Sequence, residues 1–547
     1  MTSVPSRVAD VAFRNMLLIF LFVAVSLPSA ALAQTFRGAI LGTVMDQSEA
    51  PIPGAQVNIK NQGTGLTRAA MTDEAGQFHV PELPIGDYTV TIENPGFETI
   101  TIGDVRVEVS GERRVDVTLK PGRVESRVEV RAELPLVETT TNVLGGTVQA
   151  PQIVNLPVNG RDYIKLVFMN PGISGSPDQA TDSPGSFGLF SANGARGRSN
   201  NYLLDGTDMN DGFRNLPSIN QAGVFGTPAT ILPVEAIAEM AVLSNFEPEY
   251  GRNAGAVVNI VTKSGTNQLH GSASEFLRND KMDARNFFNL APNPQTSFRN
   301  NQFGAALGGP IVRDKTFFYV DYEGQRERVG LNSLARVPTP GEIAQTRTDI
   351  ADAGGTVSPV IDALLQRNPW PAPNINLNAA LWDGDSNASV TTPAYNNINS
   401  FIGKVDHNFD SNNLLTGRYY LGDSAQSFPL ALVGGGILPG YNTFTPTRVN
   451  LVSISYVRVF SSTQVNEVRF GYNRFAEDFL PEDREFDPAS IGINTGVAAR
   501  DTGLPFMRFS GLTALGSTLS VPRGRKDTNW QFIDSFSWKF KRHEMKF

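Results

Sequence analysis

The C-terminal half of this chain alternates apolar and polar residues in segments of roughly ten residues, as where Trp530 and Phe532 flank Gln531. Successive side chains of an extended strand point to opposite faces, so each segment would have one apolar and one polar face. Ten residues are enough to cross a bilayer as a tilted strand, and hydrocarbon admits only helices or closed β-barrels. The pattern therefore predicts a partial transmembrane antiparallel β-barrel over residues 266–547, and a mainly β fold.

One residue conflicts with this alternation. Asp534 shares its parity with Trp530 and Trp538, so a regular strand would point its carboxylate toward lipid. An acidic side chain is unfavourable there. We expect either a β-bulge at this point or a position near the membrane interface.

The N-terminus has the three regions of a signal peptide over residues 1–33. Arg7 and Arg14 supply positive charge, residues 16–25 form a short apolar core, and Ala33 ends a small-residue cleavage site before Gln34. A retained membrane anchor is the alternative, but ten apolar residues are too few to span a bilayer as a helix. The chain is therefore predicted to be exported to the outer membrane of a double-membrane bacterium.

The composition excludes several kinds of site. The chain contains no cysteine, which excludes disulfides, thiolate metal sites and cysteine nucleophiles. Its net charge of -8 argues against a nucleic-acid partner, which would need a basic surface. We expect no cofactor, no metal and no enzymatic activity.

Residues 34–122 carry short strands separated by Gly/Pro turns, as in a β-sandwich. The motifs Thr72-Asp73-Glu74-Ala75-Gly76-Gln77-Phe78 and Leu83-Pro84-Ile85-Gly86-Asp87-Tyr88 resemble those of the carboxypeptidase-regulatory-like domain. Within it, His79 and Glu82 have a spacing used by zinc carboxypeptidases. A catalytic zinc needs a third protein ligand, and the four histidines of this chain are scattered, so we interpret the pair as a chance match.

Residues 136–265 resemble the plug, with an α/β fold, of TonB-dependent receptors. The resemblance rests on segments such as 193–201, 203–206, 234–242 and 255–267. The plug fills a lumen lined with polar groups, so Arg196, Arg198 and Glu239 are candidates for ion pairs with the inner wall, with Glu239 the better match to the family. The alternative for each of them is a solvated charge in a turn. The motif residues that the resemblance singles out are Arg196, Arg198, Asp205, Glu239, Tyr250, Gly251 and Lys263.

Residues 123–135 connect the sandwich to the plug. Val128 and Val130 alternate with charged residues. The segment is either the last strand of the sandwich or a TonB box, a short segment that pairs as an added strand with an energising partner. Both interpretations remain open at this stage.

The start of the barrel, over residues 270–324, resembles the Oar-like subgroup of TonB-dependent receptors. The resemblance implies an outer-membrane receptor and transporter that takes up a siderophore, an oligosaccharide or a peptide through a plugged barrel. Its implied partners are the TonB energising complex, outer-membrane lipid and an unidentified extracellular ligand. The alternative is an exported all-β surface binding or adhesion protein with a carbohydrate-binding-like N-terminal domain.

We count eight or nine barrel strands, whereas a plugged transporter lumen needs about 22. The polar stretch 329–398 is expected to be one large extracellular loop, in which residues 383–387 are a surface turn that only resembles a calcium loop. Because an open sheet edge is unfavourable in hydrocarbon, we expect the chain to be a C-terminally truncated fragment of a longer protein.

Overall fold

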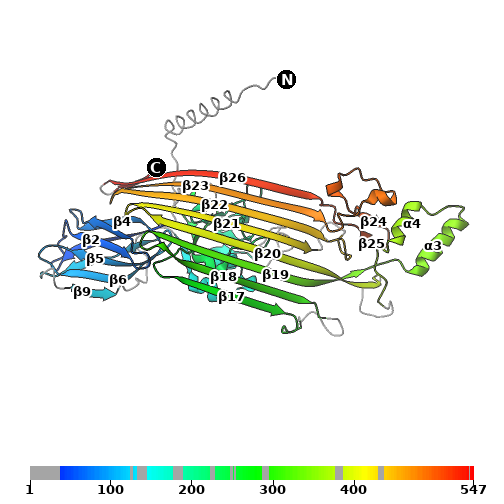
Figure 1. The fold of residues 1–547 in the computed structure, drawn as a ribbon, viewed down its shortest axis with the longest axis horizontal. Helices are drawn as coiled ribbons and strands as arrows, with labels where there is room; N and C mark the ends of the chain where they lie inside the picture. Colours follow the sequence, from blue (N-terminus) through cyan, green and yellow to red (C-terminus); the bar gives the residue numbers. More distant parts are fainter. Residues whose placement is uncertain are drawn as a thin grey trace, which may run out of the picture.

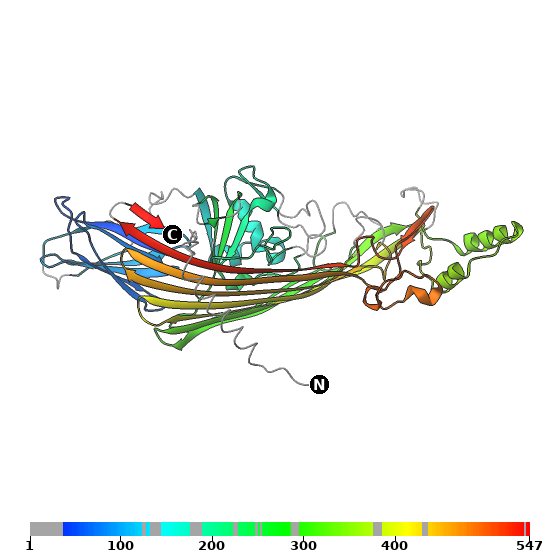
Figure 2. The same cartoon turned by 90° about the horizontal axis from the view of Figure 1, so that it is seen from above.

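The structure is a computed structural model that describes residues 37–122, 127–131, 144–175, 189–221, 228–246, 250–251, 254–285, 295–375, 386–428, 436–540 and 543–547. A small β-sandwich lies at one end of a long curved sheet, and a third unit lies against the concave face of that sheet (Figure 1, Figure 2). The predicted signal peptide and its cleavage site between Ala33 and Gln34 lie outside the described residues. No helix in the described part is both long and apolar enough to cross a membrane.

The sandwich pairs a four-stranded sheet with a five-stranded one, around a core that includes Ile59, Tyr88 and Ile92. The first sheet contains β1 (Gly38–Asp46), β4 (Gln77–Leu83), β7 (Glu112–Arg114) and β8 (Val117–Leu119). The second has the order β3 (Thr67–Met71), β2 (Gln56–Asn61), β5 (Gly86–Glu93), β6 (Thr99–Val107) and β9 (Arg127–Arg131).

The edge strand β9 comes from the predicted connector. It pairs in parallel with β6, so that Val128 is opposite Ile100 and Val130 is opposite Ile102. The sandwich therefore extends beyond its predicted end at residue 122. In this conformation the segment is a strand of the sandwich, and one of its two backbone edges is already occupied.

The third unit is the predicted plug. Its sheet has the order β10 (Leu144–Gln149), β15 (Ile237–Asn245), β16 (Val257–Thr262), β13 (Asn201–Leu204) and β14 (Thr207–Asp208). The smaller elements are α2 (Ala150–Asn155), the strand pair β11 (Ile173–Ser174) and β12 (Ser191–Ala192), and the 3-10 helices Asn159–Arg161, Tyr163–Met169, Gly197–Ser199 and Val234–Ala236.

Both faces of the plug sheet are buried. Val258 and Ile260 of β16 pack into the main plug core, whereas Val257 and Val261 pack in a second cluster that includes Val109 of the sandwich. This double burial explains why β16 carries apolar residues on both faces rather than alternating.

The long sheet is an antiparallel meander of nine strands, in agreement with the predicted eight or nine. They are β17 (His270–Asn279), β18 (Phe298–Val312), β19 (Thr316–Ala335), β20 (Ala388–Asn408), β21 (Asn413–Phe428), β22 (Thr443–Ser461), β23 (Gln464–Pro481), β26 (Arg523–Phe540) and β27 (His543–Lys546). The predicted strand length of ten residues is wrong for most of them, because β20 reaches 21 residues.

The predicted loop at 329–398 is also too long. β19 continues to Ala335 and β20 begins at Ala388, which leaves residues 336–387 for the connection. Beyond the bilayer a strand faces water outside, so it no longer needs an apolar outer face and the alternation fades. Asn387 is buried and holds Val337 through two hydrogen bonds of 2.8 Å, whereas residues 383–385 of the calcium-like turn lie outside the described residues.

The long connections gather at the end of the sheet opposite the sandwich (Figure 1). They contain α3 (Pro340–Asp352), α4 (Pro359–Gln366), the hairpin β24 (Met507–Phe509) and β25 (Leu512–Leu515), and the 3-10 helices Pro488–Ile491 and Ala499–Asp501. At the sandwich end, turns of a few residues join β20 to β21 and β22 to β23. Outer-membrane barrels have short periplasmic turns and long extracellular loops, so the sandwich lies on the periplasmic side.

Asp534 faces outward on a regular strand. The register between β23 and β26 continues without a bulge, with Val468 opposite Asp534. Its carboxylate accepts a 2.6 Å hydrogen bond from Asn466. A bulge therefore does not explain this position, and the side-chain amide of Asn466 partly satisfies the carboxylate.

Replacement of this carboxylate tests the placement. We expect Asp534→Leu to raise the free energy of unfolding of the barrel by about 1–2 kcal/mol, since a lipid-facing acid is unfavourable by less than the ~2–4 kcal/mol of a midplane Arg or Lys. The measurement is urea unfolding in lipid vesicles, with Thr528→Leu, beyond Trp530 on the same face, as the neutral control. A marked destabilisation by Asp534→Leu would contradict the lipid-facing assignment.

Candidate functional site

The deepest contact between plug and wall is centred on Asp205. This residue starts the tight turn between β13 and β14, where its φ of 47° and the φ of 68° at Gly206 give a left-handed backbone. Its carboxylate accepts hydrogen bonds of 2.8 Å from both the amide and the hydroxyl of Thr262. From the wall, Lys404 Nζ lies 3.7 Å and Arg418 Nε 3.3 Å from the two carboxylate oxygens.

All three charged groups of this contact are buried. Burial alone would raise the pKa of Asp205, but Lys404, Arg418 and the hydrogen bonds from Thr262 outweigh it and hold that pKa below its ordinary value. Asp205 is thus an anion that matches two cations of β20 and β21. Removal of one partner would leave uncompensated charge in a dry interior.

A neighbouring wall strand holds the same turn. Arg469 of β23 donates a 2.6 Å hydrogen bond to the carbonyl of Gly206 and forms a 2.7 Å ion pair with Glu467. The hydroxyls of Thr207 and Ser453 are 2.6 Å apart. The turn therefore contacts four consecutive wall strands, β20, β21, β22 and β23.

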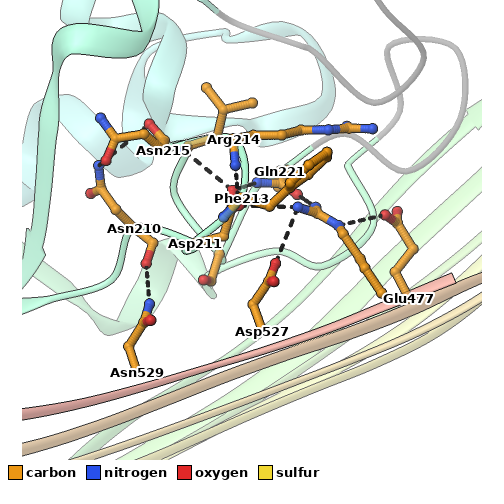
Figure 3. A network of polar contacts seen from close by, with 12 residues as sticks. Asn210, Asp211, Phe213, Arg214, Asn215, Gln221, Glu477, Asp527 and Asn529 are labelled. Carbon is orange, nitrogen blue, oxygen red and sulfur yellow. Dashed lines mark hydrogen bonds and ion pairs between the residues drawn. The ribbon is translucent and has the colours of Figure 1, made fainter.

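A second polar network lies farther toward the extracellular end (Figure 3). Arg525 of β26 is its centre, with Nη1 3.0 Å from Asp211 and Nε 3.2 Å from Glu477. The same guanidinium contacts Gln221 and lies 3.3 Å from Asp527. Asp211 and Gln221 belong to the plug and the other three residues to the wall, so this network also joins the two.

The wall residues of both networks were not predicted as site residues. Lys404, Arg418, Glu477 and Arg525 all lie on the polar, inward face of an alternating strand. Parity alone could have identified them as lumen-facing. It could not show which lumen residues meet the plug, because that depends on the fold of the plug.

Glu239 contacts the sandwich rather than the barrel wall. It is fully buried, forms an ion pair with Arg106 of β6, and accepts a 2.9 Å hydrogen bond from the amide of Val109. Burial raises the pKa of Glu239, and the contacts with Arg106 and Val109 offset only part of that effect. The expected ion pair with the wall is therefore replaced by one with the N-terminal domain.

Further contacts surround this ion pair. Tyr250 donates its hydroxyl to Ser110 at 2.9 Å, and Asn259 donates to the same hydroxyl at 3.3 Å. Gln149 donates to the carboxylate of Glu108 at 2.8 Å. The segment between β6 and β7 thus inserts into the plug, with Val109 buried in an apolar cluster.

The remaining predicted plug residues have local roles. Arg196 and Arg198 are exposed, and Arg196 has no ion-pair partner among the residues that the structure describes. Lys263 Nζ lies 3.8 Å from Glu235, within the plug. Gly251 has a φ of 66°, a conformation that favours glycine.

His79 and Glu82 lie on β4 of the sandwich. Burial lowers the pKa of His79 to about 4, with a further contribution from Lys539 and Lys546 of the barrel. Glu82 has a left-handed φ of 55°. In the described part of the chain, no three histidine, cysteine or acidic side chains are grouped as a metal site would require.

Two family models match this chain, one near each end. Residues 261–547 match the model of the outer membrane beta barrel domain, and residues 39–120 match the carboxypeptidase regulatory-like domain. Over 348 residues the chain is 28% identical to the TonB-dependent transporter Oar of Myxococcus xanthus, which covers 59% of this chain and 30% of Oar. It is 27% identical over 210 residues to the probable TonB-dependent siderophore receptor PirA of Acinetobacter baumannii, covering 37% of this chain and 25% of PirA.

The chain thus spans between a quarter and a third of the length of these curated relatives. Among solved structures, the outer membrane transporter YddB of Escherichia coli is 12% identical with a TM-score of 0.46, and the match covers 75% of this chain and 48% of YddB.

The Asp205 contact predicts a specific loss of plug retention. We expect Asp205→Asn to weaken the association of plug and wall by about 3–5 kcal/mol, because it leaves Lys404 and Arg418 buried without their anion. The rate of protease cleavage of the plug measures the change, with the exposed helix residue Asp349→Asn as the control. A triple variant in which Lys404 and Arg418 are also methionine should recover most of the loss; failure to recover would contradict the pairing.

The same contact predicts a pH dependence. Because the folded pKa of Asp205 is below its ordinary value of 3.8, its contribution is fully present above that value. It is lost as the pH falls through the lowered folded pKa. Protease resistance of the plug should therefore not change with pH near neutrality and should fall only in strong acid, and Asp205→Asn should reduce this acid sensitivity.

Glu239 predicts a measurable change in sandwich docking. Glu239→Ala removes two hydrogen bonds to a charged group, each worth roughly 1.5–3 kcal/mol, so we expect the docking equilibrium to shift at least tenfold toward release. Spin labels on the sandwich and plug would report a broader distance distribution. Glu235→Ala, which pairs only within the plug, is the control, and an unchanged distribution for Glu239→Ala would refute this docking role.

Proposed function

This chain belongs to the outer membrane beta barrel domain family and is an outer-membrane protein of a double-membrane bacterium, and we propose that it serves plug-gated, energised uptake of an extracellular ligand. The observation that carries the proposal is the set of buried ionic contacts between plug and wall. A ligand can pass only if the plug moves, and movement must break the contacts at Asp205 and Arg525.

The energetics of these contacts favour an external energy source. Breaking one buried pair is unfavourable by about 3–5 kcal/mol, so two such contacts make spontaneous opening rare, by roughly four to seven powers of ten. A plug held in this way is well suited to opening by force from the periplasm. TonB-type energisation, which is named for both curated relatives, supplies such a force.

The ligand would enter from the extracellular end, above the Arg525 network. Phe213 is exposed there beside Arg525, with the guanidinium 5.8 Å from its ring. One of the curated relatives is named a siderophore receptor, and we propose the same broad range of cargo here, namely a siderophore, an oligosaccharide or a peptide. We propose no enzymatic activity for the chain.

The connection to the energising partner is proposed to be β9. Its backbone pairs with β6 on one side, and strand addition along the other side, or exchange with β6, would give TonB a β-strand to pull. Because the sandwich is docked on the plug through Glu239, a pull on β9 would reach the plug.

Site-directed crosslinking tests this proposal. Val128→Cys in the outer-membrane protein should form a disulfide with a cysteine in the C-terminal domain of TonB, because added strands lie about 4.8 Å apart. Thr118→Cys, on the other sheet of the sandwich, is the matched control. No crosslink above this control, in cells with an energised inner membrane, would contradict the proposed energisation through β9.

A further inference from the structure

Arg68 is a buried charge of the sandwich that lacks an acceptor. It lies on β3 and is only 3% exposed, and none of its three guanidinium nitrogens has a hydrogen-bond partner among the residues that the structure describes. Burial, and to a smaller extent Arg37, lower the pKa of Arg68 to about 10, so the group remains charged at neutral pH. A buried charge without compensation is unfavourable, and water or an anion is the usual partner of such a group.

Arg68 lines a cavity between the sandwich and the periplasmic turns of the barrel, at the end of the wall beside β4 (Figure 1). The cavity has a volume of about 150 Å³. The sandwich contributes Arg68 and His79 to its lining. The wall contributes Asn412 from the turn between β20 and β21, and Ser461 and Ser462 from the turn between β22 and β23. A space of this size admits several water molecules, and it therefore also admits one oxyanion of five heavy atoms.

His79 is a second polar group of this cavity that the protein leaves unsatisfied. Its Nδ1 is buried and has no hydrogen-bond partner in the described part of the chain. Burial lowers the pKa of His79 to about 4, with smaller contributions from Lys539 and Lys546, so the ring is neutral near neutral pH. A neutral imidazole with its proton on Nδ1 can donate a hydrogen bond to an anion in the cavity.

Positive charge exceeds negative charge around the cavity. The charged groups that act on Arg68 and His79 are three cations and two carboxylates, namely Arg37, Lys539, Lys546, Glu82 and Asp410. The carboxylate of Asp410 is engaged elsewhere, since both of its oxygens accept 2.9 Å hydrogen bonds from the side chain of Asn413. With Arg68 itself included, four cations act against two carboxylates, which favours an anionic ligand.

The donors line the cavity from two sides. Arg68 and His79 come from strands of the sandwich, whereas Ser461 and Ser462 come from the opposing turn and carry hydroxyl groups. A guanidinium can bind two oxygens of one phosphate group, which leaves the other phosphate oxygens for the remaining donors. A carboxylate has only two oxygens, and a bidentate contact with Arg68 would use both. The set of donors therefore suits a phosphate group better than a carboxylate.

We propose that this cavity binds a phosphate group, either as free phosphate or as part of a small phosphorylated molecule. Ala69 and Ser462 also line a larger, open cavity of about 730 Å³ beside it, which has room for the remainder of such a molecule. Because the donors come from two domains, bound phosphate would join the sandwich to the wall and stabilise its docked position. This inference does not depend on the proposed transport function.

Titration of the purified chain in detergent micelles with inorganic phosphate tests the proposal, with NMR of isotope-labelled histidine as the readout. At constant pH and ionic strength we expect a saturable change in the signal of His79, whereas His270 of the barrel is the internal control. The pKa of His79 should rise when phosphate is bound, because a nearby anion favours the charged imidazolium. Tighter binding of glycerol phosphate than of inorganic phosphate would identify a phosphorylated molecule as the ligand, and equal or weaker binding would identify free phosphate.

Two variants separate a loss of binding from a loss of folding. Arg68→Gln should weaken phosphate binding by about tenfold or more, because it removes a charged hydrogen-bond donor. Ser462→Asp places a carboxylate at the cavity from an exposed turn and should weaken binding similarly, without a change in the core of the sandwich. Thr463→Asp, in the same turn but outside the lining of the cavity, is the matched control and should bind phosphate as the unchanged chain does.

The absence of a saturable response of His79 to phosphate would overturn the proposal. So would equal binding by the unchanged chain, Arg68→Gln and Ser462→Asp. Complete competition by acetate at the same concentration as phosphate would also overturn it, because it would assign the cavity to carboxylates.

Discussion

The burial of Asp205 between two wall cations is the interaction on which the plugged architecture depends. A plug that fills a polar lumen removes charged groups of both surfaces from water, and each of them then needs a partner. Asp205 meets this need for Lys404 and Arg418 at once. Wall side chains also satisfy plug carbonyls, as where Tyr420 donates to Ile231 at 2.7 Å. The plug is therefore positioned mainly by polar matching with the wall, while its own core supplies its fold.

The N-terminal sandwich is part of the same mechanical arrangement. The resemblance to plug domains singles out Glu239 and Tyr250 as plug residues. Both contact the sandwich, Glu239 through Arg106 and Tyr250 through Ser110. Val109 of the sandwich completes the second apolar cluster of the plug. Release of the sandwich would therefore expose the face of the plug sheet that carries Val257 and Val261. Sandwich and plug thus stabilise each other, and the sandwich is more than an appended domain.

The sequence predicts the fold of each domain well, but it does not predict which residues of the neighbouring domain each site residue contacts. Alternation identifies the wall because lipid on one face and a filled lumen on the other impose a strict contrast, and the predicted eight or nine strands agree with the nine observed. The contrast disappears beyond the bilayer, which is why β19 and β20 continue into the predicted loop. Asp205 is found by its motif, but the choice of Lys404 and Arg418 as partners depends on how the plug is seated. The partner of Glu239 was missed because its charge suits either the wall or the sandwich, and only the fold decides between them.

The positions of the contacts determine how a pull from the periplasm would act. The sandwich holds the plug at β15 through Glu239 and at β16 through Asn259, which donates to Ser110. The wall holds it at the turn after β13 and at Asp211, on the other side of the sheet order. A force on the sandwich therefore reaches β15 and β16 first and passes to β13 across its parallel pairing with β16. Thr262 at the end of β16 donates two hydrogen bonds to Asp205, so displacement of that strand would withdraw donors from the same carboxylate that binds the wall. Loss of those donors destabilises the charged form of Asp205, which Lys404 and Arg418 need as their partner. The deepest plug–wall contact is therefore the one most directly coupled to movement of the sandwich.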